Sequence, residues 1–201
     1  MQLKPTAMAQ PSPRRARGVT MLEVLVAIFI LSVGLLGAAG LQSKMQIAEI
    51  EAYQRAQAIV LLQDMVDRVN ANRKNVDDYV TGTSTPLGTG DLDCSALTTP
   101  ADKDKCEWNN SLFGAAETKG GASLGAMTGA RGCITNPVTA MPREVVVAVA
   151  WQGIAPTLAP GATACGQGDY GTDDRVRRAM VARITIGCLQ NDPGTGLCVT
   201  P

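Results

Sequence analysis

Any chemistry in this 201-residue chain would have to come from carboxylates and cysteines, because the chain contains no histidine. Histidine is the commonest general base and the commonest metal ligand in proteins. Without it, a serine- or cysteine-based triad lacks its usual base, and no paired-carboxylate motif stands out in the sequence. The composition therefore predicts a protein that is not an enzyme and that uses no cofactor and no small-molecule substrate.

Glu23 is the carboxylate in the most unusual position. The residues that follow it, 24–41, form an apolar run of about 18 residues without a charge, which is long enough for a helix to cross the core of a bilayer. Basic residues before such a helix, here Arg14, Arg15 and Arg17, predict that its N-terminus stays in the cytoplasm. An acid at the membrane end of a helix is costly unless it is neutralised, so Glu23 is a candidate functional residue.

A partner for Glu23 would arise if the chain were cut after Gly18. The new α-amino group of Val19 would then lie one helical turn from the carboxylate. The same amine on a neighbouring copy could also pair with Glu23, which would favour stacking of subunits in register. The alternative is that Glu23 lies at headgroup level without a function, and geometry alone leaves both interpretations open.

The stretch from Gly18 to Glu23 resembles the cleavage and methylation motif of type IV pilins and type II secretion pseudopilins. Its letters are Gly18 followed by Val-Thr-Met-Leu-Glu and the apolar run. In that family a prepilin peptidase cuts after the glycine and methylates the new first residue, which is usually phenylalanine, so Val19 departs from the pattern. The resemblance implies that Gly18 and Val19 are the processing residues and that Glu23, fifth in the mature chain, acts in assembly.

A secretory signal peptide is the competing interpretation, because the small residues at positions 37–40 could form a signal-peptidase site. A signal sequence normally has a shorter apolar region that does not open with an acid, so the pilin motif is favoured. The two interpretations differ in outcome. A pilin keeps the helix in the mature protein, whereas a signal peptide is discarded.

The six cysteines all lie beyond the apolar run, which places them on the exported side of the membrane. An even number of cysteines there predicts disulfides, and the absence of any Cys-x-x-Cys pair gives little support to zinc or thioredoxin-type chemistry. Short spacing favours Cys94–Cys106 as the first pair and Cys188–Cys198 as the second, while the other connectivities stay open. The disulfide candidates are Cys94, Cys106, Cys133, Cys165, Cys188 and Cys198.

The charges argue against a nucleic-acid partner. The segment before Val19 has a net charge of +4 and the remainder has −4, whereas nucleic-acid binding needs a basic face. A cluster of Arg175, Arg177 and Arg178 could suggest DNA uptake, but it follows Asp173 and Asp174, so a solvated hairpin end is the preferred interpretation.

Four aspartates raise the question of calcium binding. They lack the glycine and the bidentate glutamate of an EF-hand loop, so solvated loop acids are favoured and no metal site is expected. These residues are Asp91, Asp93, Asp102 and Asp104.

The helix that begins with the apolar run is expected to continue for about 50 residues, ending near residues 70–72. Its second half carries apolar residues three and four apart, and two acid-before-base pairs, Glu51 with Arg55 and Asp64 with Arg68, support it. The apolar residues expected on the buried stripe are Leu41, Met45, Ala48, Ala52, Ile59, Leu62, Val66 and Val69.

The apolar half of the helix must be buried in lipid or against other helices. Gly34, Gly37 and Gly40 are spaced three apart and could let neighbouring helices approach closely, although glycine is also common in membrane helices. The expected organisation is a leader at 1–18, a transmembrane and assembly segment at 19–41, an amphipathic helix at 42–73 and a periplasmic β-rich domain at 74–201.

Two strands stand out in the C-terminal part. Residues 144–151 are apolar on both faces, which predicts a strand covered by a helix on one side and by loops on the other. Residues 176–187 alternate better, and the 153–171 segment between the two is long for a hairpin. A small antiparallel sheet packed on the amphipathic half of the helix makes this an α+β protein with a type IV pilin-like plan.

Residues 74–140 are the least regular part of the sequence. The 81–90 segment is expected to be a turn-rich loop, 102–113 a short helix, and 114–132 a connection rich in glycine and alanine.

The order of features along the chain further resembles PilV, a family of minor pilins called type IV pilus modification proteins. The similar features are the helix ending at 61–73, the Cys106-Glu107-Trp108 region, Gly132-Cys133-Ile134, and the valine-rich strand that ends in Ala150-Trp151-Gln152-Gly153.

That resemblance implies a low-abundance subunit that primes pilus assembly with other minor pilins near the fibre tip and supports adhesion and twitching motility. The implied partners are prepilin peptidase, the inner membrane, other minor pilins and the major pilin. A minor pseudopilin of a type II secretion system is the runner-up. An exported enzyme on a membrane anchor is less well supported.

Overall fold

A computed structural model describes residues 18–114, 118–119, 122–123, 127–138 and 142–188. The expected leader, apart from Gly18, and the expected disulfide partner Cys198 lie outside the described residues. The chain divides into two compact units, residues 1–45 and residues 46–201.

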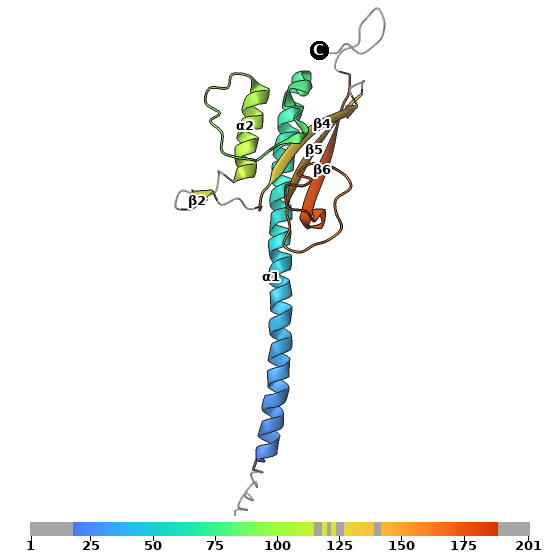
Figure 1. Cartoon of the computed structure of the whole chain (residues 1–201). Helices are drawn as coiled ribbons and strands as arrows, with labels where there is room; N and C mark the ends of the chain where they lie inside the picture. Colours follow the sequence, from blue (N-terminus) through green and yellow to red (C-terminus); the bar gives the residue numbers. More distant parts are fainter. Residues whose placement is uncertain (1–17, 115–117, 120–121, 124–126, 139–141, 189–201) are drawn as a thin grey trace, which may run out of the picture. The chain divides into compact units, whose positions relative to one another are not determined.

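The longest element is helix α1, which runs without interruption over Met21–Ala71, 51 residues (Figure 1). Its start and end agree with the expected helix. No proline occurs within it, so nothing removes a backbone hydrogen bond along its length. A short 3-10 helix, η1, follows at Arg73–Tyr79 and buries Val76 and Tyr79 in the core.

The second half of α1 packs into the core of the globular unit through a stripe that only partly matches the expected one, since Leu62 and Val69 are buried as expected but other members are exposed. Ala58 and Met65 are completely buried, whereas Ile59, expected on the stripe, is 48 % exposed. Apolar side chains occur on more than one side of this half, so periodicity alone does not select the face that packs. The buried residues of the helix are Gln54, Ala58, Leu62, Met65 and Val69.

One of the two expected helical ion pairs forms. Arg68 Nε lies 3.0 Å from Asp64 Oδ1, as expected for an acid four residues before a base. Glu51, in contrast, does not pair with Arg55. Its carboxylate lies 3.0 Å from the guanidinium of Arg178, which is far along the chain. A tertiary partner has replaced the local one.

A four-stranded antiparallel sheet forms the other layer, with strand order β1-β4-β5-β6, and a separate two-stranded ribbon pairs β2 with β3. The strands are β1 Gly82–Leu87, β2 Thr118–Lys119, β3 Ala122–Ser123, β4 Arg131–Val138, β5 Arg143–Gln152 and β6 Arg177–Ile186.

Strand β5 is buried on both faces, as the sequence predicts. One face contributes Val145, Val147, Val149 and Trp151 to the main core, which also contains the buried residues of α1. The other face contributes Ala148 and Ala150 to a smaller cluster around the Cys133–Cys165 disulfide. A helix covers one side and a disulfide-anchored loop covers the other, so the α+β pilin-like fold is confirmed.

Strands β1 and β4 correct the expectation of irregular structure in this region. The 81–90 segment, expected to be a loop, contains β1, and the expected 114–132 connection runs into β4. The sequence of β1, Gly-Thr-Ser-Thr-Pro-Leu, has the composition of a turn, and only pairing with β4 makes it a strand.

Helix α2, Pro100–Phe113, confirms the expected short helix and extends it by two residues at its start. The Thr99 side chain accepts a hydrogen bond from the Asp102 N–H at the N-terminus, and Gly114 adopts a left-handed conformation at the C-terminus. Trp108 is fully buried, and its Nε1–H donates to the Leu61 carbonyl of α1 at 2.8 Å, which joins the two helices.

Candidate processing and assembly site

The backbone just before α1 is exposed and has no regular secondary structure. Gly18, Val19 and Thr20 all lie in this segment, and Val19 is 69 % exposed. A Cβ atom placed on Gly18 would meet nothing within 4 Å. Exposed, non-helical backbone is where proteases cut most readily, so the Gly18–Val19 bond is accessible.

Thr20 fixes where the helix begins. Its Oγ1 accepts a hydrogen bond from the Glu23 N–H at 3.3 Å, and its carbonyl accepts one from the Val24 N–H at 3.3 Å. Threonine followed three residues later by glutamate is the capping-box pattern, and the threonine half of that box is formed here. This role of Thr20 was not predicted from the sequence, although the Thr-x-x-Glu spacing is a signal for it.

Glu23 lies in the first turn of α1, where the helix dipole favours a negative charge. Its side chain forms no ion pair with any residue of the described part of the chain. The uncut chain has no free amine at Val19, so the pairing considered for the cut chain cannot form in it. Among the described residues, the Glu23 carboxylate is therefore left without an ionic partner.

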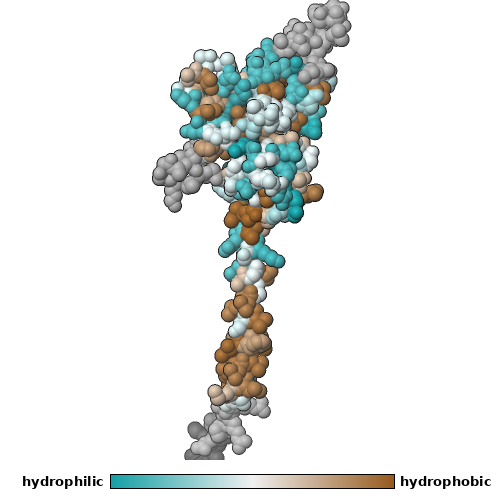
Figure 2. Space-filling model, in the orientation of Figure 1, coloured by the Kyte–Doolittle hydropathy of each residue, from teal (hydrophilic) through white to brown (hydrophobic). Residues whose placement is uncertain are grey.

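The apolar half of α1 is uncovered by the rest of its own unit. Its large hydrophobic side chains from Met21 to Met45 are between 46 % and 87 % exposed. The face of this part of the helix seen in Figure 2 is mostly hydrophobic. The Ser32 hydroxyl donates to the Ile28 carbonyl at 2.8 Å, which satisfies it without water. Gly34, Gly37 and Gly40 have open space where a Cβ would lie.

Length and composition allow one helix of the described residues, α1, to cross a membrane, with a mean hydropathy of 2.6 in its most apolar stretch. A signal sequence can have the same length and apolar composition, so these two properties do not distinguish a signal sequence from a retained membrane helix. The chain carries a prokaryotic N-terminal methylation motif. The family model of that motif matches residues 13–39, which include Gly18, Val19 and Glu23.

This match supports a type IV pilin-like protein, either a pilin or a pseudopilin. A prepilin-type motif implies processing by prepilin peptidase and assembly with other pilins, and with the apolar helix it fits a membrane-anchored, pilus-associated protein. No curated protein and no solved structure gives a significant match to the chain.

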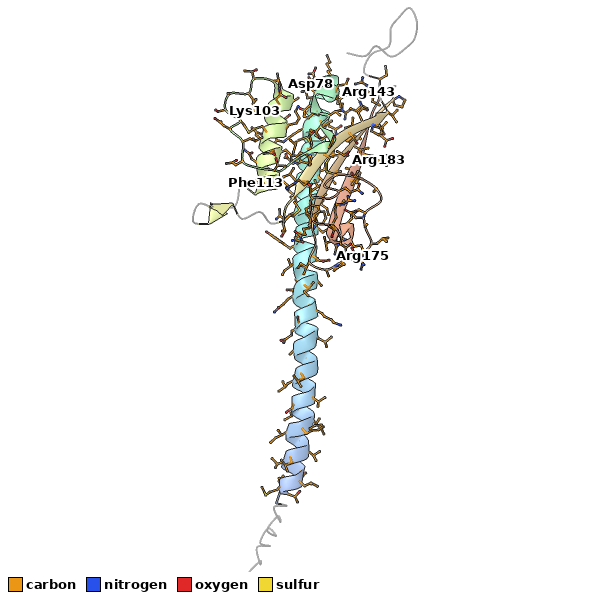
Figure 3. The ribbon with its side chains drawn as sticks, viewed as in Figure 1. Asp78, Lys103, Phe113, Arg143, Arg175 and Arg183 are labelled. Carbon is orange, nitrogen blue, oxygen red and sulfur yellow. A yellow bond between two sulfur atoms is a disulfide. The ribbon has the colours of Figure 1, made fainter. Side chains whose placement is uncertain are left out.

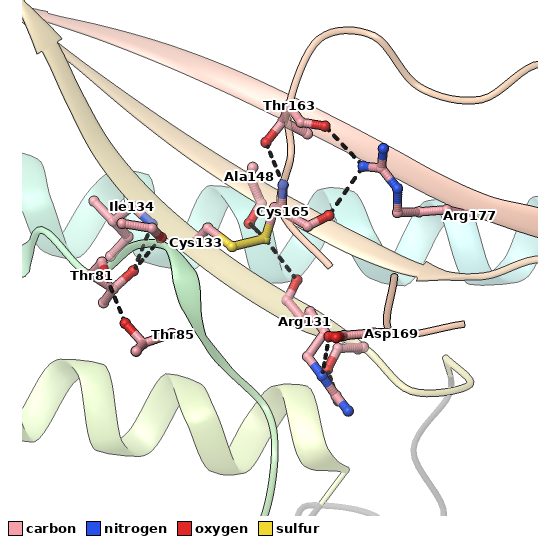
Figure 4. Close-up of a disulfide and its surroundings, with 12 residues drawn as sticks. Thr81, Thr85, Arg131, Cys133, Ile134, Ala148, Thr163, Cys165, Asp169 and Arg177 are labelled. Carbon is pink, nitrogen blue, oxygen red and sulfur yellow. Dashed lines mark hydrogen bonds and ion pairs between the residues drawn. A yellow bond between two sulfur atoms is a disulfide. The ribbon is translucent and has the colours of Figure 1, made fainter. Parts of the chain in front are cut away.

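Two disulfides with both cysteines among the described residues hold loops of the globular unit. Cys94 is joined to Cys106, the pair that short spacing favours, which attaches the loop before α2 to that helix. Cys133 of β4 is joined to Cys165 of the loop between β5 and β6 (Figure 4). Cys188 is also disulfide-bonded, and Cys198, its expected partner, lies outside the described residues.

Arg177 corrects the expectation of a solvated arginine cluster, because its side chain is only 1 % exposed. The guanidinium donates to both carboxylate oxygens of Asp174, at 2.7 and 2.8 Å. It also donates to the carbonyls of Thr163 at 2.8 Å and Cys165 at 3.1 Å (Figure 4), and to the carbonyl of Pro160 at 3.1 Å. The hydrogen bonds from Arg177 hold the pKa of the Asp174 carboxyl below its usual value.

The arginine therefore acts as an internal cation that fixes the loop over the Cys133–Cys165 disulfide. The sequence could not reveal this role, because the three carbonyls that accept from Arg177 belong to a loop whose path is set by the tertiary fold.

The four aspartates considered for calcium do not converge. Asp102 bonds to Thr99 and to Lys105 at 3.0 Å, while Asp104 bonds to Arg68 and to the Tyr79 hydroxyl. Within the described ranges, no group of three or more acids, cysteines or histidines is arranged to hold a metal ion.

The Asp104 carboxylate belongs to an ionic network that joins α1 to α2. Arg68 Nη1 lies 2.9 Å from Asp104 and 2.7 Å from Glu107. Burial lowers the pKa of Arg68, but hydrogen bonds to Glu107, Asp64 and Asp104 outweigh burial, so the pKa lies above its usual value. Burial, reinforced by the hydrogen bond to Asp104, raises the pKa of Tyr79 to about 12. These groups thus support the fold around the end of α1.

Proposed function

We propose that this protein is a minor pilin of the type IV pilus, similar to the PilV family. Prepilin peptidase cuts it after Gly18 and methylates Val19, and Glu23 then pairs with an N-terminal amine and sets the register between subunits. The observation that carries the proposal is the exposed Gly18–Val19 bond, two residues before a capped helix that has an acid in its first turn and an uncovered apolar surface after it.

The proposed location follows from the same features. Residues 1–18 are removed, 19–41 anchor the subunit in the inner membrane, and 42–73 with 74–201 form the periplasmic part. The disulfides suit an oxidising compartment. The subunit then enters the fibre with other minor pilins and the major pilin, primes assembly near the tip, and supports adhesion and twitching motility.

A minor pseudopilin of a type II secretion system is the alternative, because it would use the same N-terminal motif. Deletion of the gene distinguishes the two proposals. Loss of twitching with normal secretion supports the pilin, whereas loss of secretion with normal twitching supports the pseudopilin.

Processing is tested with Gly18→Val. Because a Cβ at Gly18 meets nothing within 4 Å, the substitution leaves the fold intact and acts on cleavage alone. We expect an uncut precursor in the membrane fraction. Gly40→Val is the matched control, since it alters the competing signal-peptidase site and should leave cutting unchanged. Normal trimming of Gly18→Val would refute the assigned site.

The role of Glu23 is tested with Glu23→Val and with Glu23→Gln, which removes the charge but keeps the shape of the side chain. Both variants should be processed normally but be poorly incorporated into fibres, because the amine of a neighbouring subunit finds no carboxylate. Thr20→Val is the control, since it removes the helix cap and keeps the charge. Incorporation of Glu23→Gln equal to that of the unaltered protein would remove the assigned role.

A further inference from the structure

The two edges of the four-stranded sheet differ in how well they are protected against pairing with another strand. Edge strand β1 has six residues, contains Gly82 and Pro86, and has a register shift, all of which discourage further pairing. Edge strand β6 has ten residues, each aligned with β5 in unbroken register and none of them glycine or proline. Among the described strands, β6 is thus the long, regular edge.

The hydrogen bonds of β4 establish which backbone groups of β6 point outward. Thr81 N–H donates to the Ile134 carbonyl at 2.9 Å, and Ile134 N–H donates to Thr81 Oγ1 at 3.0 Å. The backbone of Ile134 therefore faces Thr81 and not its β5 partner Val147. Because the backbone groups of a strand alternate in direction, Val147 faces β6, and its partner there, Ala182, faces back toward β5.

The alternation is the same just after the end of β5, where the Gly153 N–H points toward β6 and donates to the Val176 carbonyl at 2.8 Å. Alternation along β6 then leaves the backbone N–H and C=O groups of four residues pointing away from the sheet. Among the described residues, none forms a hydrogen bond with these outward-pointing groups. The four residues are Ala179, Val181, Arg183 and Thr185.

The side chains at this edge are suited to burial under another strand. Ala179 and Val181 pack only partly against the smaller cluster on one face, and Met180 and Ala182 only partly against the main core on the other. Each retains exposed apolar surface that an added strand would cover. Arg183, labelled in Figure 3, is the strongly exposed charge of the strand.

A positively charged hollow lies beside the start of β6. Two adjoining hollows, of about 240 Å³ and about 420 Å³, share Arg55 of α1, Trp151 of β5 and Arg178 of β6 in their walls. Arg178 pairs with Glu51, whereas Arg55 is exposed and forms no ion pair in the described part of the chain. The hollow therefore has an unneutralised guanidinium.

We infer that the outer edge of β6 accepts an extended segment of another protein as a fifth, antiparallel strand. Its apolar side chains cover the edge residues, and an acidic residue near its C-terminal end pairs with Arg55, because an antiparallel strand ends beside the start of β6. A second copy of β6 fits less well, since it would bring further arginines to this edge and no free acid for Arg55. This inference does not depend on the proposed function.

The experiment uses the full chain in detergent micelles and the peptide Val-Thr-Val-Thr-Val-Glu as the probe. Amide exchange measured by NMR should slow at Val181 and Arg183 when the peptide is added, and should stay unchanged at Met180 and Ala182, whose N–H groups already bond to β5. This alternation is specific to strand addition and would not arise from general rigidification.

Two variants at one position test the backbone contact. Arg183→Ala and Arg183→Pro both lose the ion pair with Glu144, but only Arg183→Pro also loses the outward N–H. Loss of one backbone hydrogen bond should weaken peptide binding about fivefold relative to Arg183→Ala. Arg55→Ala should weaken binding of this peptide and leave unchanged the binding of a peptide that ends in glutamine, a comparison that holds even if the proline variant unfolds.

Three outcomes would overturn the inference. These are absence of peptide binding, slowed exchange without the alternation, and equal affinity of the alanine and proline variants with no effect of Arg55→Ala. Alternating protection that rises with protein concentration without peptide would also overturn it, in favour of pairing between two copies.

Discussion

Replacing Arg177 by methionine is expected to destabilise the globular unit more than any other single arginine substitution in β6. Methionine preserves most of the side-chain volume and removes all five hydrogen bonds of the guanidinium. The Asp174 side chain is 28 % exposed, so water can replace part of its lost partner. Cys165 is fully buried, so water cannot easily reach its carbonyl.

The magnitude follows from these contacts. A hydrogen bond to a charged group contributes about 1.5–3 kcal/mol, and a buried acceptor left without a partner costs about 1–3 kcal/mol. Because solvation of Asp174 recovers part of the loss and such terms are not additive, we expect a loss of about 3–4 kcal/mol in the free energy of unfolding. For a domain of this size that lowers the melting temperature by about 10 °C.

Arg183→Met is the matched control, since this arginine lies on the same strand and has one exposed ion pair, with Glu144. An exposed pair contributes about 1 kcal/mol or less. Thermal and urea unfolding of both variants, with disulfides intact, give the comparison. A melting temperature for Arg177→Met equal to or above that of Arg183→Met would refute the assigned role of Arg177.

Two further predictions concern the same unit. Gly132→Ala should lower the free energy of unfolding by about 1–3 kcal/mol, because the added Cβ would lie 2.4 Å from two ring carbons of the buried Trp108. Gly90→Ala, where a Cβ meets open space, should change stability little. Urea unfolding measures both variants, and equal effects would contradict this packing. The pKa of Asp174 is held below 3.8 by Arg177, so the ion pair stabilises the fold above that pH and this stability is lost as pH falls through the lowered pKa. Asp174→Asn should therefore flatten the acid side of the stability–pH curve, and an unchanged curve would contradict this.

Local sequence signals predicted the elements that local physics determines. The uninterrupted apolar run and the absence of proline predict α1, and the valine-rich stretch predicts β5 with both faces covered. Residues whose partners lie far along the chain could not be predicted in this way. Glu51 pairs with Arg178 and not with Arg55, and β1 is a strand because β4 pairs with it.

The functional residues likewise differ in how well the sequence reveals them. Gly18, Val19 and Glu23 are recognisable because their motif is contiguous, and the structure adds that Thr20 caps the helix beside them. Arg177 resembled one member of an exposed basic cluster, because nothing near it in the sequence shows that three carbonyls of a distant loop surround its guanidinium.

The intact mass of the mature protein, purified from membranes or fibres and measured before and after reduction, tests the central claim most directly. We expect a chain that begins at Val19, carries one methyl group, and on reduction gains the mass of the hydrogens added to its disulfides. A mature chain that begins near Gly40 or Leu41 would contradict it, because the apolar helix would then be absent from the finished protein.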